Sequence, residues 1–171
     1  MNTKTMFSSD KENWCTPKRF FKSLNAHFNF DLDAAASKEN ALCEKYITKE
    51  NNALVVPWDG QRIFVNPPYG RNLRSWANKI VEEASTGRKT IVALVPARTD
   101  TQWFFTLTKD LTTEVYFISG RLHFNETKTV APFPSALVIL NHHWLGHTST
   151  STTYFDDDKL LQFHAWMFKP E

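Results

Sequence analysis

The apolar positions of the chain recur with two spacings, and these predict helices alternating with strands. Apolar residues three or four positions apart mark one face of a helix. On this pattern, helices are expected over residues 17–28, 73–84 and 100–107. Short runs rich in β-branched and aromatic residues predict strands over residues 30–33, 62–65, 90–95, 114–118 and 135–140. Such alternation predicts an α/β protein with a mainly parallel sheet covered by helices on both faces.

The chain length favours one compact domain over residues 1–171. Residues 1–13 are polar and expected to be loose, residues 147–153 form a polar link, and residues 157–168 are expected to form a C-terminal helix. The segment 119–135 is rich in turn residues and fits either a hairpin or a functional loop. Because there is no room for a large recognition domain, any target must be recognised by loops.

Composition and residue spacing argue against several kinds of binding site and cellular location. The net charge of +2 is too small for a protein held to nucleic acid by charge alone. Cys15 and Cys43 lack the spacing of a zinc site or a disulfide framework, and His142, His143 and His147 have no acidic or cysteine ligands at a suitable spacing, so no metal is expected. Without a signal peptide or a membrane-spanning run, the sequence predicts a cytoplasmic protein of a bacterium or a phage-infected host cell, with no membrane partner.

The strongest chemical signal is the loop Asn66-Pro67-Pro68-Tyr69, at the end of a predicted strand. Open α/β sheets bind ligands at this edge. Asn66 Oδ1 and the Pro67 carbonyl could accept the two hydrogens of a planar amine and free its delocalised lone pair for attack. Proline fixes these acceptors in advance, and Tyr69 could stack on a base rotated out of a duplex. The alternative is a proline-rich turn with no chemical role.

Several motifs together resemble the Dam-type DNA N6-adenine methyltransferases of bacteriophages and prophages. They are W-x-T-P at 14–17, D-L-D-A-A-A at 31–36, N-P-P-Y-G at 66–70, P-A-R-T-D-T at 96–101, G-R-L at 120–122 and P-F-P-S at 132–135. The resemblance implies a Rossmann-like fold that moves a methyl group from S-adenosylmethionine to N6 of adenine in double-stranded DNA, as phage or prophage DNA modification. It points to GATC as the recognition sequence, whereas a surface built from short loops could equally read DNA less strictly.

The resemblance also implies a set of cofactor contacts. Asp33 matches the acidic position of the cofactor motif, and Ala34 and Ala35 match small residues that permit close approach. Asn52 is a looser match to the position that contacts the cofactor's adenine. The remaining candidates come from the first motif, namely Trp14, Thr16 and Pro17. Trp14 could equally be a core or lid aromatic. The glycine-rich turn usual after the first strand is missing from D-L-D-A-A-A-S.

Candidate DNA contacts follow two of the predicted strands or lie in loops. Arg98, Thr99 and Asp100 come directly after a strand that a proline ends, although Asp100 could simply cap a helix. Basic side chains that could reach phosphates or base edges are Arg71, Arg74, Arg121 and Lys128. Each of these could also be an ordinary solvated surface charge.

Two other functions stay open at the level of the sequence. N-P-P-Y loops also serve enzymes that methylate RNA adenines or protein glutamines, because a planar amide poses the same lone-pair problem, and the fold does not decide between substrates. A non-catalytic nucleic-acid-binding module on the same fold is the third interpretation. The oligomeric state and a restriction partner are likewise left open.

Overall fold

One mixed sheet organises the protein. The computed structural model describes residues 14–110, 113–126, 130–141 and 153–156. In them six strands lie in the order β1-β2-β3-β5-β4-β6. Their bounds are β1 Leu32–Asp33, β2 Arg62–Val65, β3 Thr90–Pro96, β4 Glu114–Ser119, β5 Ser135–Leu140 and β6 Thr153–Asp156. The pairs β1–β2, β2–β3 and β4–β6 are parallel, whereas β5 runs antiparallel to both β3 and β4. Five of the six described strands therefore run in one direction and only β5 opposes them, as expected for a mainly parallel sheet.

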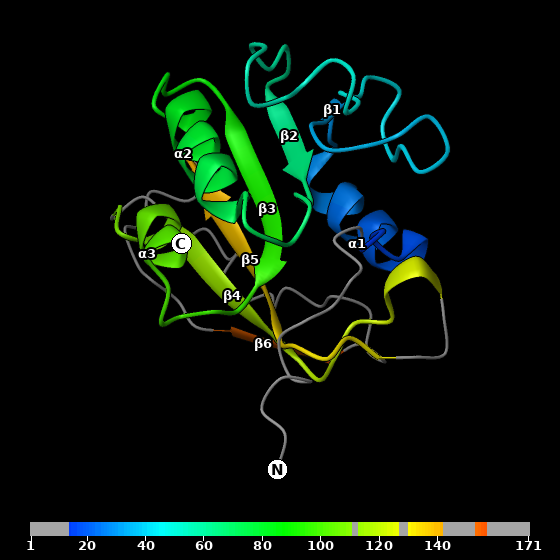
Figure 1. Cartoon of the computed structure of the whole chain (residues 1–171). Coiled ribbons are helices and arrows are strands. Elements are labelled where there is room, and N and C mark those ends of the chain that lie inside the picture. The colour runs from blue at the N-terminus through cyan, green and yellow to red at the C-terminus, as the bar shows by residue number, and fades with distance from the viewer. Residues whose placement is uncertain (1–13, 111–112, 127–129, 142–152, 157–171) are drawn as a thin grey trace, which may run out of the picture.

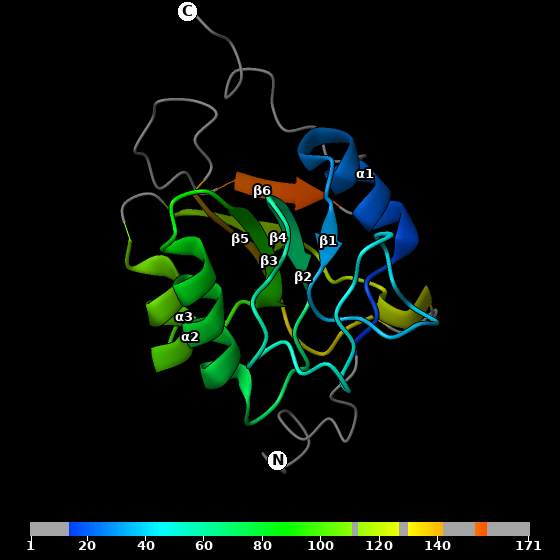
Figure 2. The same ribbon diagram turned by 90° about the horizontal axis from the view of Figure 1, so that it is seen from above.

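Helices cover both faces of this sheet, as the sequence predicted (Figures 1 and 2). Helix α1 (Lys18–Phe28) packs on one face, where its buried Phe20, Phe21, Leu24 and Phe28 meet Phe64 of β2. Helices α2 (Leu73–Ala84) and α3 (Gln102–Thr108) pack on the other face. None of these described helices has the length and apolar character needed to cross a bilayer.

Helix α1 begins at Lys18, one residue later than expected. Pro17 occupies the N-cap position, and no side chain caps the helix there. Thr16 Oγ1 instead accepts a hydrogen bond from Asn66 Nδ2 at 2.9 Å. Helix α3 likewise begins later than expected, because Thr101 is its N-cap and its hydroxyl accepts from the Phe104 amide. Asp100 is exposed and lies before this cap.

The strands bring several loops to one edge of the sheet. The buried side chains of β2 and β3 alternate between the two cores, with Ile63 and Val65 on the α2 side and Phe64 on the α1 side. Because β1, β2 and β3 are parallel, their carboxyl ends lie at the same edge. β4 runs antiparallel to β5, as does β3, so the carboxyl end of β4 also points to this edge.

Two connections were less clear from sequence. The segment between β4 and β5 joins antiparallel neighbours, and it contains the 3-10 turn Phe124–Glu126. Strand β6 was not expected, and its first residue, Thr153, ends the predicted polar link at 147–153. The expected loose segment 1–13, the rest of that link, the C-terminal helix at 157–168 and the three histidines lie outside the described residues.

Candidate active site

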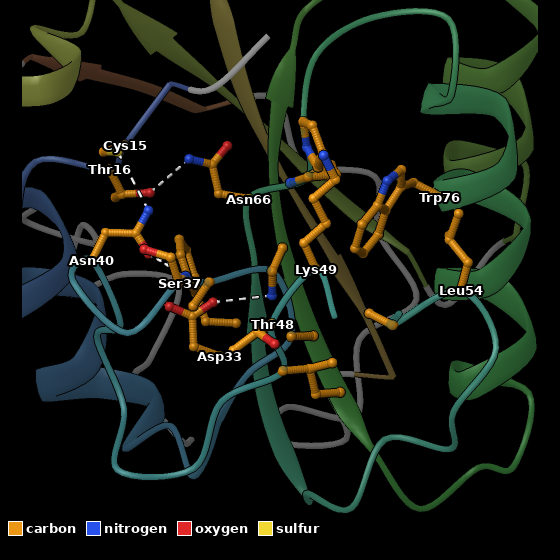
Figure 3. A pocket seen from close by; sticks show the side chains of 18 of the residues that line it. Cys15, Thr16, Asp33, Ser37, Asn40, Thr48, Lys49, Leu54, Asn66 and Trp76 are labelled. Carbon is orange, nitrogen blue, oxygen red and sulfur yellow. Dashed lines mark hydrogen bonds between the residues drawn. The ribbon is translucent and has the colours of Figure 1, made fainter. Parts of the chain in front are cut away.

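A cavity of about 1160 Å³ opens at the carboxyl ends of β1 and β2. Its walls come from the segment 14–16, from the long connection between β1 and β2, and from the loop that follows β2 (Figure 3). Trp76 reaches it from α2. Pockets for cofactors and small ligands usually measure about 300–1,000 Å³, so this cavity is at least as large as a usual ligand site.

Asn66 follows β2 directly and lies in the wall of this cavity. Its Nδ2 donates to the Trp14 carbonyl at 2.5 Å and to Thr16 Oγ1 at 2.9 Å. The Trp14 carbonyl can only accept, so it fixes the orientation of the Asn66 amide. Asn66 Oδ1 is buried and has no hydrogen-bond partner among the described residues. An unpaired buried acceptor costs about 1–3 kcal/mol, so Oδ1 is suited to a donor supplied by a ligand.

The rest of the N-P-P-Y loop divides between cavity and core. Pro67 and Pro68 line the cavity. Tyr69 is 6% exposed, its hydroxyl donates to the Leu94 carbonyl, and its ring packs edge-on against Phe133 with centroids 5.4 Å apart. Burial raises the pKa of the Tyr69 hydroxyl. The structure therefore places Tyr69 in the core beneath the site, and not in the cavity wall where the sequence analysis expected a ring open for base stacking.

Asp33 is a buried carboxyl group at the end of β1. Its two oxygens accept the backbone amides of Ala35 at 3.3 Å and Leu42 at 3.2 Å. Burial raises the pKa of Asp33 to about 6, although both hydrogen bonds act in the opposite direction. A carboxyl group kept in a cavity at this cost is a candidate ligand-binding group.

Most of the predicted cofactor residues meet at the cavity. Its lining includes Trp14, Thr16, Asp33, Ala34, Ala35 and Asn52. Ala34 is fully buried and its amide donates to the Phe64 carbonyl, so a small side chain lets β1 and β2 approach at this point. Asn52 adopts a left-handed conformation with φ 54°. Pro17 is the exception, since it caps α1 and does not line the cavity.

Much of the cavity wall, above all the part from the β1–β2 connection, was not predicted from the sequence. The missed lining residues include Cys15, Ser37, Asn40, Thr48, Lys49, Leu54 and Trp76 (Figure 3). Asn40 joins two parts of this wall, because its Oδ1 accepts the Ser37 amide and its Nδ2 donates to Cys15 Sγ. The polar composition of 37–54 was the available signal, but it has no helical or strand period.

The predicted DNA contacts lie outside the cavity but near the same sheet edge. Arg71 follows β2, residues 98–100 follow β3, and Arg121 follows β4. Arg71, Thr99, Asp100 and Arg121 are exposed, whereas Arg98 is half-buried. Arg74 is exposed on the first turn of α2, and Lys128 lies outside the described residues. The fold thus brings the predicted contacts that it describes to the side of the molecule where the cavity lies.

Comparison with known proteins identifies the family. The model of the family described as DNA N-6-adenine-methyltransferase (Dam) matches residues 2–162. The chain belongs to this family. The DNA N-6-adenine-methyltransferase of Haemophilus phage HP1 is 32% identical over 130 residues, which cover 75% of this chain and 73% of that protein. The enzyme of the same name from Escherichia phage T1 is 33% identical over 132 residues, covering 68% of this chain and 55% of that protein. The resemblance inferred from the motifs is confirmed.

Proposed function

We propose that the protein is a site-specific DNA methyltransferase that moves a methyl group from S-adenosylmethionine to N6 of adenine in double-stranded DNA. The observation that carries this proposal is the buried Asn66 Oδ1, an acceptor at the end of a sheet strand that has no partner among the described residues. Membership of the Dam family supports the choice of DNA and adenine. The GATC context is proposed from the resemblance alone.

Asn66 would act on the nucleophile. The lone pair of adenine N6 is delocalised into the ring, which makes the amine a poor nucleophile. Asn66 Oδ1 accepts one N6 hydrogen and the Pro67 carbonyl accepts the other, which favours a pyramidal nitrogen. Because Trp14 and Thr16 already hold the Asn66 amide, its oxygen needs no reorganisation when the base arrives. The proton can leave after transfer, since the methylated amine is acidic, so no strong general base is needed.

The other end of the cavity fits the methyl donor. S-adenosylmethionine supplies an electrophilic methyl group on a sulfonium. Asp33 would accept hydrogen bonds from donor groups of this ligand, while Ala34 and Ala35 leave space for its approach. Asn52, Thr16 and Trp14 line the same cavity and complete the proposed set. The cavity volume of about 1160 Å³ accommodates this ligand together with a base.

The fold is proposed to be a variant of the Rossmann-like methyltransferase fold. The parallel strands β1, β2 and β3, with helices on both faces, support this assignment. The cavity at their carboxyl ends is where such sheets bind ligands. Short alanines replace the usual glycine-rich turn after β1, and the buried Ala34 lets β2 approach closely.

DNA is proposed to approach the same edge of the sheet. The exposed Arg71, Arg74 and Arg121 would contact phosphates or base edges, and Arg98, Thr99 and Asp100 would follow the target strand. Lys128 belongs to the same proposed set. Because the net charge is only +2, this local cluster would have to supply most of the electrostatic attraction.

A methyl-transfer assay with product identification tests the proposal. Purified protein is incubated with S-adenosylmethionine carrying a labelled methyl group and with duplex DNA, RNA or a glutamine-containing protein extract. We expect label in DNA only, recovered as N6-methyl-2′-deoxyadenosine after digestion to nucleosides. Single-molecule sequencing of the same DNA then reports the sequence context. Label in RNA or protein would show that one of these, and not DNA, is the substrate. A titration that detects no binding of S-adenosylmethionine would favour a non-catalytic module.

A further inference from the structure

A second unpaired polar atom lies beside the proposed amine site. The indole Nε1 of Trp14 is buried and has no hydrogen-bond partner among the described residues. Trp14 lines the cavity that Asn66 also lines, and its own carbonyl holds the Asn66 amide at 2.5 Å. A buried indole N–H nearly always has a partner. Two cavity-lining residues in direct contact thus carry an unsatisfied donor and an unsatisfied acceptor.

The packing of Trp14 shows which side of the cavity its indole occupies. Its ring packs edge-on against Phe124 and Phe133, with centroids 5.6 and 5.2 Å apart. These phenylalanines flank the ends of β4 and β5, on the opposite side of β2 from β1 in the strand order. Asp33 ends β1. The indole is thus displaced from the proposed cofactor end toward the side where the target amine would lie.

Trp14 is also held firmly in this position. Asn125 Oδ1 accepts the Cys15 amide at 2.8 Å, and the Asn125 amide donates to the Cys15 carbonyl at 2.9 Å. This reciprocal pair fixes the residue that follows Trp14 to the β4–β5 connection. On the other side, Cys15 Sγ accepts from Asn40. The indole N–H therefore has a fixed position before any ligand binds.

We propose that Trp14 and Asn66 together read the edge of the target base. Asn66 Oδ1 accepts from the exocyclic amine, and Trp14 Nε1 donates to the ring nitrogen next to it, either N1 or N7 of adenine. Guanine and thymine place a carbonyl oxygen where the amine would be, so Asn66 Oδ1 would face another acceptor. The pair thus selects a base with an amine beside a ring acceptor. This inference rests on the proposed function, and it moves Trp14 from the cofactor to the base.

Atom-level changes on both partners test this assignment. The protein change is Trp14→Phe, which keeps an aromatic ring against Phe124 and Phe133 but removes the N–H. Trp103→Phe, at a half-buried tryptophan of α3, is the matched control. The substrate changes are duplexes whose target adenine is replaced by 1-deazaadenine or 7-deazaadenine, each of which keeps the amine. kcat/KM is measured for every combination, together with the KM for S-adenosylmethionine.

With the wild-type protein we expect one of the two analogues to lose about tenfold in kcat/KM, as for a lost buried hydrogen bond. Trp14→Phe should lose a similar factor on adenine and should lose nothing further on that same analogue. Trp103→Phe should match the wild type on all three substrates. The analogue that shows this coupling identifies the nitrogen that accepts from Trp14.

Three results would overturn the inference. Wild-type protein that uses both analogues as well as adenine has no contact to either nitrogen, and this arm does not depend on the variant folding. If the loss in kcat/KM from Trp14→Phe and the loss from an analogue multiply when the two are combined, the two changes act independently. A raised KM for S-adenosylmethionine in Trp14→Phe, with equal losses on all substrates, would return Trp14 to the cofactor. Failure of the proposed function differs from all of these, because wild-type protein would then methylate no duplex at all.

Discussion

Replacing Asp33 by asparagine would remove a buried charge from the cavity. Asp33 is 3% exposed, and burial raises its pKa from 3.8 to about 6. Asparagine has a similar shape but cannot titrate. It keeps one oxygen for either the Ala35 or the Leu42 amide and leaves the other amide without an acceptor. The substitution therefore has a pH-independent cost of about 1–3 kcal/mol and a pH-dependent benefit.

The sign and size of the pH-dependent part follow from proton linkage. Because the folded-state pKa lies above the unfolded value, the folded protein binds more protons between about pH 4 and pH 6. The contribution of Asp33 to stability is thus fully present below pH 4 and is lost as the pH rises through 6. A shift from 3.8 to about 6 corresponds to about 3 kcal/mol. The wild-type free energy of unfolding should fall by this amount relative to Asp33→Asn as the pH rises from 4 to 7.

Urea denaturation of both proteins across this pH range measures the effect. The difference between the two free energies of unfolding isolates Asp33, because every other titrating group is common to both. A difference that stays constant from pH 4 to pH 7 would refute the reasoning from burial. A difference that changes in the opposite direction would show that the hydrogen bonds from Ala35 and Leu42 outweigh desolvation.

The same titration has a consequence for the cofactor. If the charged form of Asp33 accepts hydrogen bonds from S-adenosylmethionine, the affinity should fall about tenfold for each pH unit below 6. Isothermal titration between pH 5 and pH 7.5 measures this dependence. Affinity that does not change with pH would remove Asp33 from the cofactor set while leaving its burial unchallenged.

The other predictions concern the amine side of the cavity. Asn66→Ala should lower the rate of methyl transfer at least about 100-fold with little change in S-adenosylmethionine affinity, and unchanged turnover would exclude Asn66 from the mechanism. Tyr69→Ala should lower the free energy of unfolding by about 3–5 kcal/mol, whereas Tyr69→Phe should lose only the hydrogen bond to the Leu94 carbonyl. If Tyr69→Ala instead lost about 1–3 kcal/mol of DNA affinity and no stability, the ring would have to leave the core and stack on a base. Asn125→Gly keeps the left-handed backbone at φ 58° and the backbone bond to the Cys15 carbonyl, but it removes the side-chain acceptor of the Cys15 amide, so turnover should fall by up to about tenfold. Asn29→Gly at φ 49° serves as a control that leaves turnover unchanged.

The local hydrophobic pattern of the sequence was sufficient to predict the helices and strands that form the sheet edge. β2 has the predicted bounds because Ile63, Phe64 and Val65 are consecutive buried residues and two prolines follow them closely. The buried faces of α1 and α2 also match the predicted apolar positions. β6 escaped prediction because Thr153–Asp156 follows a low-complexity polar run, and its place in the sheet depends on pairing with β4.

The cavity wall between β1 and β2 depends on contacts that are distant in sequence. Trp58 is buried, its indole donates to the Ala53 carbonyl, and its amide donates to Glu83 Oε1 of α2. Glu83 is itself paired with Lys79 at 2.7 Å and with Lys89 at 2.5 Å. No periodicity in the polar segment 37–54 encodes this attachment. The burial of Tyr69 was missed for the same reason, because Phe124 and Phe133 come from another part of the chain.

The site residues predicted from the sequence are largely the same residues that destabilise the folded protein in the absence of ligands. Asp33 is buried with a raised pKa, and Asn66 Oδ1 and Trp14 Nε1 are buried without hydrogen-bond partners in the described part of the chain. Each lowers the stability of the protein without ligands. Thr16 holds the Asn66 amide, and Asn125 holds Cys15 next to Trp14, but neither supplies a missing partner. Stability alone would favour relaxed alternatives at these positions. A ligand that supplies the missing donors and acceptors restores the lost stability. These residues could therefore be predicted from the chemical motifs in the sequence, although the hydrophobic pattern gives no sign of them.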